Sequence, residues 1–277
     1  MRTTRARIIG IAVAVVIIVV TGCATTGPGG QKSLILISTA QETSIGQQMD
    51  QELRKSEKFL ADPEWQTYVN DVGQRIVAVS DRKDLAFQFA VIESDDINAF
   101  AAPGGYVYFY SGLIREMDKE SELVAVMAHE ISHVVGRHSI KRLQSVMGAS
   151  ILLQLALGGG SENTRALAST ALGIVMSGYS RSQETEADNF GTLYMTKAGW
   201  NPQGMLTMFD KLGALSGQQE IGLFEMLAST HPATDNRIEA TRTQIAEMGS
   251  LSSTLQMDNP RFQTLKKRLP PKKDQKK

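Results

Sequence analysis

The chain contains very little cysteine and histidine. Its 277 residues include one cysteine, Cys23, so no internal disulfide can form. Only four histidines are present, and a metal site built on imidazole must draw on them. Lysine plus arginine equals aspartate plus glutamate at 29 each, so composition gives no reason to expect a nucleic-acid partner. No internal repeat is visible.

The sequence also lacks an apolar run of ordinary membrane-spanning length, which is about 20 residues. Its longest run near the N-terminus, 8–20, has 13 residues and follows Arg2, Arg5 and Arg7. A basic stretch followed by a short apolar run is typical of a secretory signal, which we expect over residues 1–22. The alternative is a short membrane anchor.

Cys23 follows directly after this apolar run. The tetrapeptide Val20-Thr21-Gly22-Cys23 resembles a bacterial lipobox, although valine replaces the usual leucine. We therefore expect lipid attachment at Cys23 and a flexible tether over residues 23–39. Because Ala24 comes next, the resemblance to Gram-negative lipoproteins implies an anchor at the periplasmic face of the outer membrane.

Apolar periodicity predicts an α+β fold that is mostly helical, with a small β-sheet. Strands are expected over 87–92 and 106–110. Helices are expected over 40–59, 63–80, 121–139, 182–197, 201–212 and 234–248. We predict one domain over residues 40–250, followed by a basic, mobile tail over 251–277.

Residues 149–179 are unusually apolar and are interrupted by three glycines at 158–160. Neither apolar half is long enough to span a bilayer. A buried helical hairpin is the favoured interpretation. A mobile flap hinged at the glycines is the alternative.

The segment His129-Glu130-Ile131-Ser132-His133 carries the clearest chemical pattern. On a helix, residues four apart share a face, so His129 and His133 can bind one metal ion. Glu130 lies about 100° around the helix, where it can reach a metal-bound water. This spacing supplies two zinc ligands and a general base. The apolar residues around them predict a buried helix, in which paired histidines need a partner.

Zinc requires a third protein ligand. His138 is five residues beyond His133 and points away, which favours a structural role near the helix end. The better candidate is Glu184, within a Ser-Arg-x-x-Glu-x-x-Ala-Asp pattern that ends at Asp188. By helical spacing Asp188 shares a face with Glu184 and could hold a ligand histidine through its second ring nitrogen. Glu186 points elsewhere and is expected to be a solvated charge.

The two motifs, about fifty residues apart, together resemble metallopeptidase family M48, the gluzincins that include the CAAX prenyl proteases. Segments 98–105, 198–202 and 229–232 extend the resemblance to roughly residues 40–245. It implies a zincin-like protease domain with one Zn²⁺ held by His129, His133 and Glu184. The lipobox points to the periplasmic lipoprotein branch, and we expect no C-terminal helical-repeat domain.

The resemblance implies a lipid-anchored zinc metalloendopeptidase that cleaves unfolded or misassembled envelope proteins, with Glu130 as general base. His231 is either a structural residue before Pro232 or, by resemblance, a group that approaches the zinc. There it would block the water position or stabilise the oxyanion. The strand 106–110 is expected to be an edge strand that binds substrate through Tyr106 and Tyr108, or a half-exposed strand. A chaperone-like lipoprotein with structural zinc is the alternative function.

Overall fold

A computed structural model describes residues 25–30, 32–158, 161–216, 230–232 and 234–272. The predicted signal over 1–22 and the predicted lipidation site Cys23 lie outside these ranges. Within them, no helix is both long and apolar enough to cross a membrane.

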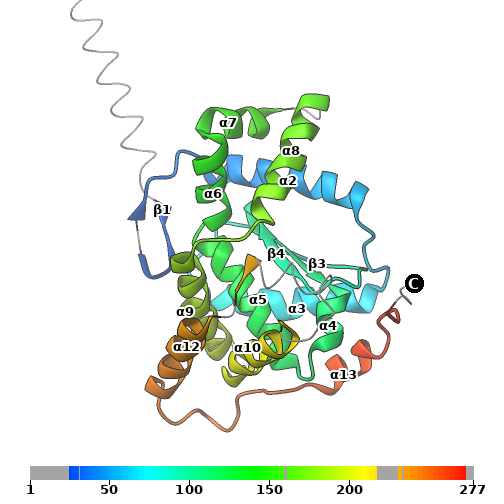
Figure 1. Ribbon diagram of the computed structural model, residues 1–277, viewed down its shortest axis with the longest axis vertical. Coiled ribbons are helices and arrows are strands. Elements are labelled where there is room, and N and C mark those ends of the chain that lie inside the picture. The colour runs from blue at the N-terminus through cyan, green and yellow to red at the C-terminus, as the bar shows by residue number, and fades with distance from the viewer. Residues whose placement is uncertain (1–24, 31, 159–160, 217–229, 233, 273–277) are drawn as a thin grey trace, which may run out of the picture.

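The centre of the fold is a three-stranded sheet made of β3 (Gln88–Ile92), β4 (Ala99–Ala102) and β5 (Tyr106–Tyr110). The strand order is β3-β5-β4, with β3 parallel and β4 antiparallel to β5. A short turn, η2 (Pro103–Gly105), joins β4 to β5. Helices pack around this small sheet (Figure 1), so the predicted α+β fold is confirmed.

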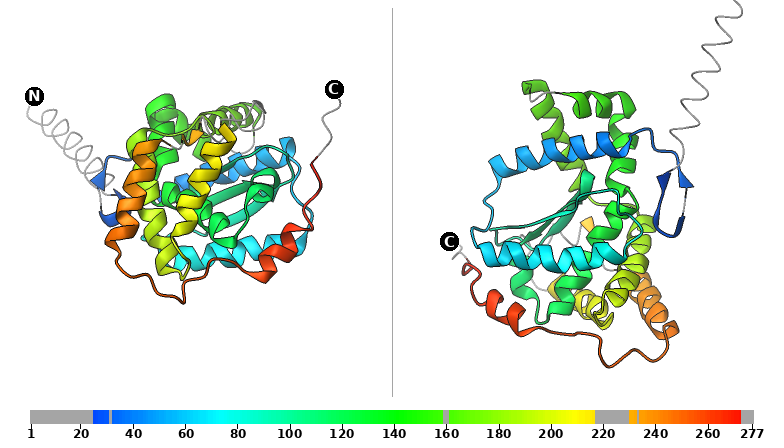
Figure 2. Two further views of the ribbon diagram at one scale, coloured as in Figure 1. Left: turned by 60° about the horizontal axis from the view of Figure 1, so that its bottom comes forward. Right: turned by 180° about the vertical axis from the view of Figure 1, so that it is seen from behind.

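Helices cover both faces of the sheet. Val107 and Phe109 pack with α3 (Pro63–Val79) and α5 (Glu120–Val135) in one apolar cluster. The alternate residues of β5 pack with α2 (Thr39–Ser56) in a second cluster. The right-hand view of Figure 2 shows the sheet lying between α2 and α3. Alternate side chains of β5 therefore pack into two apolar cores, instead of one core and the solvent.

Local signals at the helix starts agree with the structure. Ser38 and Gln41 form a reciprocal capping box at the start of α2. Asp62 caps α3, and Pro63 occupies its first turn, where a missing amide hydrogen costs nothing. The predicted apolar face of α3, namely Trp65, Tyr68, Val69, Val72 and Ile76, is buried throughout.

Residues 149–179 contain two helices, α7 (Ala149–Leu157) and α8 (Glu162–Val175). They follow α6 (His138–Met147) and pack against α2 (Figure 1). Leu152 and Leu155 of α7 are buried in the second core, while the opposite side of that helix is exposed. The two helices lie where they were predicted, but only their inner sides are buried, so the expectation of a buried hairpin holds only in part.

The remaining described elements lie around α5 and toward the two ends of the described chain. They are β1 (Thr25–Thr26), η1 (Pro28–Gly30), β2 (Lys32–Ser33), α4 (Ser111–Glu116), α9 (Arg181–Lys197), α10 (Gln203–Ser216), α12 (Asp235–Glu247) and α13 (Pro260–Lys266).

Packed residues extend beyond both predicted domain boundaries, at 40 and at 250. In the expected tether, Ile35 and Ile37 are 2% and 1% exposed and belong to the second core. In the expected mobile tail, α13 buries Phe262 completely, and the indole nitrogen of Trp65 donates to the carbonyl of Leu265 at 2.9 Å. Apolar residues spaced among polar and basic ones were sufficient to attach both segments to the cores.

The prediction that β5 is an edge strand is wrong. β5 is the central strand, and Tyr106 and Tyr108 are 5% and 1% exposed, so neither is open to a substrate. Tyr108 donates instead to Asp50 of α2 at 2.8 Å. The outer edge of β3 is partly covered, since Leu60 donates to the carbonyl of Val91. The other outer edge of the sheet is that of β4, which lies beside α5.

Candidate zinc-peptidase active site

The site forms where α9 crosses the catalytic helix α5. Helix α5 supplies His129, Glu130 and His133, and α9 supplies Glu184 and Asp188. The crossing is close because α9 has a glycine at the contact point. A Cβ atom on Gly191 would lie only 3.0 Å from the backbone nitrogen of His129. This close packing brings the acids of α9 to the histidines of α5.

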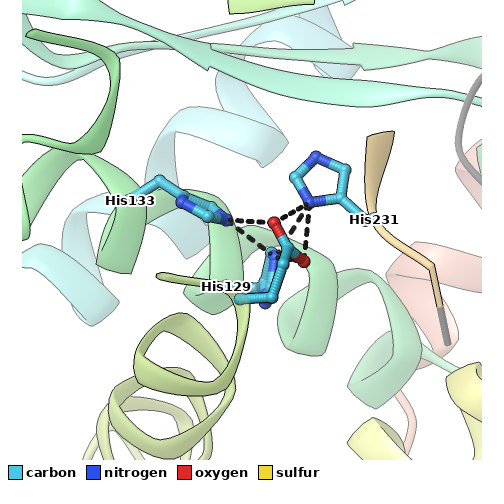
Figure 3. A group of neighbouring side chains, drawn as sticks. His129, His133 and His231 are labelled. Carbon is cyan, nitrogen blue, oxygen red and sulfur yellow. Dashed lines mark hydrogen bonds and ion pairs between the residues drawn. The ribbon is translucent and has the colours of Figure 1, made fainter. Parts of the chain in front are cut away.

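Four buried side chains converge at this crossing. The Nε2 atoms of His129 and His133 are 3.0 Å apart. Glu184 lies 3.5 Å from the first nitrogen and 3.4 Å from the second. His231 completes the group, and the ligand atoms of all four residues lie within 4.8 Å of one another. Figure 3 shows the three imidazole rings directed toward one another.

These separations fit a zinc ion. Ligand atoms at about 2.0–2.1 Å from a tetrahedral zinc are about 3.3 Å apart. The spacings among His129, His133 and Glu184 range from 3.0 to 3.5 Å. The second ring nitrogens of both histidines are engaged elsewhere, at 2.9 Å from Asp188 and 2.8 Å from His138. Both Nε2 atoms are therefore available to a cation, and the three residues are the expected ligand set.

The electrostatics of the cluster also favour a cation. Burial alone would lower the pKa of His129, but hydrogen bonds with Asp188 and Glu184 raise it to about 10. Burial holds the pKa of His133 well below its usual range, so that ring is neutral, as a metal ligand must be. The acids of the site thus favour positive charge, which a proton on His129 supplies without metal; a metal ion at Nε2 would replace that proton.

Asp188 orients His129 as the helical spacing predicted. Its carboxylate accepts from the Nδ1 atom of His129 at 2.9 Å. Burial would raise the pKa of Asp188, but hydrogen bonds from Arg237 and His129 hold it below its usual value. The carboxylate is therefore ionised and fixes both the tautomer and the orientation of the ring.

Glu130 lies beside the cluster with one oxygen free. It is 1% exposed, and among the described residues its Oε2 atom has no hydrogen-bond partner. Its Oε1 atom is 3.6 Å from Nε2 of His231, and the backbone of Ala101 in β4 hydrogen-bonds to the carboxylate. Burial raises the pKa of Glu130, which makes it a stronger base than an exposed glutamate.

His231 belongs to the cluster despite lying about 100 residues beyond His129 in the sequence. Its Nδ1 atom is 3.2 Å from Nε2 of His129 and 2.9 Å from Oε1 of Glu184. The residue is 6% exposed. A purely structural role before Pro232 would not require the ring to enter a group of potential metal ligands.

Arg237 is a site residue that the sequence did not reveal. It donates to both oxygens of Asp188 at 2.6 and 2.8 Å, and it lies 3.0 Å from Glu184. It also donates to the carbonyl of Pro232 at 2.8 Å, next to His231. One guanidinium therefore connects the α9 acids to the segment that carries His231. Its position six residues after His231, in a predicted helix, was the only available hint.

His138 and Tyr179 support His133 from the other side. Helix α5 ends at Val135, and Arg137 adopts a left-handed conformation at φ 54°, which turns the chain so that His138 faces back. Tyr179 stacks on the ring of His133 at 4.0 Å between centroids. Glu186 is half-buried at 3.6 Å from His138 rather than a freely solvated charge.

An apolar hollow adjoins the cluster. Val126 of α5 and Met205, Met208, Phe209 and Leu212 of α10 line it together with His129, Glu130 and His231. Asp188 and Arg237 also line it, and apart from these two and the three cluster residues its lining is apolar.

Comparison with known proteins agrees with this site. A family model described as peptidase family M48 matches residues 63–245. The beta-barrel assembly-enhancing protease of Escherichia coli K12 is 34% identical over 224 residues, covering 76% of this chain and 45% of that protein. The mitochondrial metalloendopeptidase OMA1 of Schizosaccharomyces pombe is 34% identical over 181 residues, covering 65% and 53%.

A third relative, the metalloprotease YcaL of Escherichia coli K12, is 31% identical over 162 residues, which is 57% of this chain and 62% of that protein. The chain spans about half the length of the curated relatives it matches. Because the family model covers most of the chain, including all the residues of the cluster, the chain belongs to peptidase family M48 and carries that family's zinc metallopeptidase domain.

Proposed function

We propose that the protein is a lipid-anchored zinc metalloendopeptidase that cleaves unfolded envelope proteins. The observation that carries the proposal is the buried convergence of His129, His133 and Glu184 beside a glutamate with a free oxygen. A purely structural zinc site would use four protein ligands and would not need this base.

His129, His133 and Glu184 would hold the zinc. When bound, zinc lowers the pKa of a coordinated water toward about 7 and polarises the substrate carbonyl. Glu130 takes a proton from the attacking water on its Oε2 atom as the water oxygen bonds to the carbonyl carbon. It then gives this proton to the amine nitrogen as the peptide C–N bond breaks. Asp188 and His138 hold the two histidine rings in place through their Nδ1 atoms.

The substrate backbone pairs with the outer edge of β4. The carbonyl of Ala101 accepts from Ser139 at 3.0 Å and from Tyr179 at 3.3 Å, and its backbone also bonds to Glu130. These polar groups of β4 therefore face the site. An extended chain that replaced the hydroxyls of Ser139 and Tyr179 would lie next to Glu130. Its backbone would be recognised, and all unfolded proteins share that backbone.

His231 controls access to the zinc in a resting state. Its Nδ1 atom lies at hydrogen-bond distance from both His129 and Glu184, in the part of the cluster where a water would otherwise bind. Cleavage then requires the segment that carries His231 to move. A role in stabilising the oxyanion is the competing proposal, and the two predict opposite effects of removing the ring.

The lipobox at Cys23 supports an anchor at the periplasmic face of the outer membrane. A relative named for enhancing beta-barrel assembly supports envelope proteins as the substrate class. Incorporation of labelled fatty acid into the wild type, but not into a Cys23→Ser protein, tests the anchor.

The activity is tested with Glu130→Gln in the full chain. We expect it to bind one zinc per chain but to lose about 10²- to 10⁴-fold in the cleavage rate of unfolded casein. Glu116→Gln, the same change at an exposed position, should retain the rate. A chelator should abolish cleavage by the wild type, and added zinc should restore it. Zinc-loaded Glu130→Gln protein with wild-type cleavage would refute the proposal.

A further inference from the structure

Large apolar side chains are exposed at one end of the described molecule. Among the described residues, five large aliphatic side chains are between 37% and 80% exposed, and they are Leu34, Leu36, Val146, Ile151 and Leu157. All of them belong to the segment before α2 or to helices α6 and α7. We refer to these five residues as the α6–α7 surface.

The segment before α2 is attached directly to α6. The backbone amide of Leu36 donates to the side chain of Gln144 at 2.8 Å, and that side chain donates to the carbonyl of Leu34 at 3.3 Å. Val146 follows Gln144 by two residues, and α7 begins directly after Gly148. The exposed side chains therefore follow one another across adjoining elements rather than being scattered over the molecule.

The outer side of α7 carries no charge. Its exposed residues, Ser150, Ile151, Gln154 and Leu157, recur at helical spacing, while Leu152 and Leu155 point into the core. No acidic or basic residue occurs in this helix. A helix that faces water usually carries charges on its outer side. A helix that lies at a bilayer surface buries apolar residues among the lipid headgroups.

The path of the chain brings the predicted lipid anchor, Cys23, near this surface. Thr25 of β1 pairs with Ser33 of β2, the neighbour of Leu34. Cys23 is only two residues before Thr25, a reach of about 7 Å, and paired strands lie about 5 Å apart. A lipid on Cys23 would therefore hold the bilayer within about 12 Å of the backbone at Ser33.

We propose that the α6–α7 surface docks on the phospholipid bilayer and fixes the orientation of the protease on the membrane. This inference rests on the proposed lipid anchor at Cys23. A hollow lined by Ser33, Val146 and Tyr179 adjoins the surface and extends to His138, which contacts the ligand His133. Docking would place this hollow beside the lipid headgroups, so the protease would meet chains held at the membrane surface.

The test uses the full lipidated chain in vesicles of phosphatidylethanolamine and phosphatidylglycerol that contain a spin-labelled lipid. Acylated Cys23 leaves no free thiol, so Val146→Cys and Leu157→Cys each provide a single site for an environment-sensitive fluorophore. The matched control is Glu239→Cys, whose native side chain is 67% exposed on α12. Helix α12 lies at the opposite end of the molecule from α7 (Figures 1 and 2).

We expect a blue shift and the loss of most emission at residues 146 and 157, with little change at residue 239. Equal quenching at all three positions, or none in protein that floats with the vesicles, would overturn the docking while leaving the anchor intact. A blue shift that appears without vesicles and grows with protein concentration would instead identify a second copy as the occupant. Protein that does not float, with an unmodified Cys23 peptide by mass spectrometry, would reject the anchor and the docking together.

Discussion

Replacing Asp188 by asparagine keeps the size of the side chain but removes its charge. The carboxylate holds the ring of His129 at 2.9 Å and accepts two hydrogen bonds from Arg237. The substitution weakens cation binding, because a neutral amide holds the ligand ring less firmly than a carboxylate does and one nearby negative charge disappears. Removing a group that orients a metal ligand typically costs 10- to 100-fold in metal affinity, or about 1.4–2.8 kcal/mol.

The same substitution also lowers stability without metal. Arg237 loses its strongest partner but remains 3.0 Å from Glu184 and bonded to the carbonyl of Pro232. Because Arg237 keeps some of its partners, we expect the free energy of unfolding to fall by about 1–3 kcal/mol. Because a ligand stabilises the folded state in proportion to the logarithm of its affinity, excess zinc should increase the deficit by the additional 1.4–2.8 kcal/mol or so.

Urea unfolding of wild type and Asp188→Asn, each in excess zinc and in chelator, separates these two contributions. The difference between the two deficits measures the effect of Asp188 on the metal alone. Asp71→Asn makes the same chemical change at an exposed salt bridge with Arg261, so it should cost less than about 1 kcal/mol in both conditions. Equal deficits of Asp188→Asn with and without zinc would refute the role of Asp188 in orienting His129.

Three further predictions address other parts of the structure. His231→Ala should raise the basal rate of casein cleavage if the ring blocks the zinc, and a fall in kcat would favour oxyanion stabilisation instead. Arg237→Leu should cost about 3–5 kcal/mol in urea unfolding because it removes the guanidinium that pairs with two buried acids, whereas Arg242→Leu, at an exposed pair on the same helix, should cost under about 1 kcal/mol. Phe262→Ala should also cost about 3–5 kcal/mol; a change near zero would restore the view of a mobile tail.

The parts of the site that follow from local spacing could be predicted from sequence. His129 and His133 share a helical face because they are four residues apart, and the same spacing relates Glu184 to Asp188. The meeting of the two helices required family resemblance, since no spacing rule connects segments about fifty residues apart. The structure then places all four residues at one crossing. The ligand atoms of His129, His133 and Glu184 lie at distances that fit one ion, and Asp188 contacts the ring of His129.

The supporting residues could not be predicted because they depend on turns and on distant packing. His138 was expected to continue the catalytic helix and point away from the metal site. The break at Gly136 and the left-handed Arg137 reverse that direction. A left-handed arginine has no clear sequence signal, because this conformation is uncommon outside glycine and asparagine. Arg237 depends on three elements meeting at Asp188, which no local pattern specifies.

The sheet shows most clearly what periodicity leaves open. Alternation along β5 correctly separated the tyrosines from Val107 and Phe109, but it could not show that both sides are buried. Helix α2 looked polar, yet its stripe of Ile45, Met49 and Leu53 covers the tyrosine side, and its Asp50 accepts from Tyr108. The remaining edge of the sheet belongs to β4, whose four residues are all buried and show no alternation. The proposed pairing with substrate depends on backbone groups of β4 that face the site, and side-chain patterns carry no information about them.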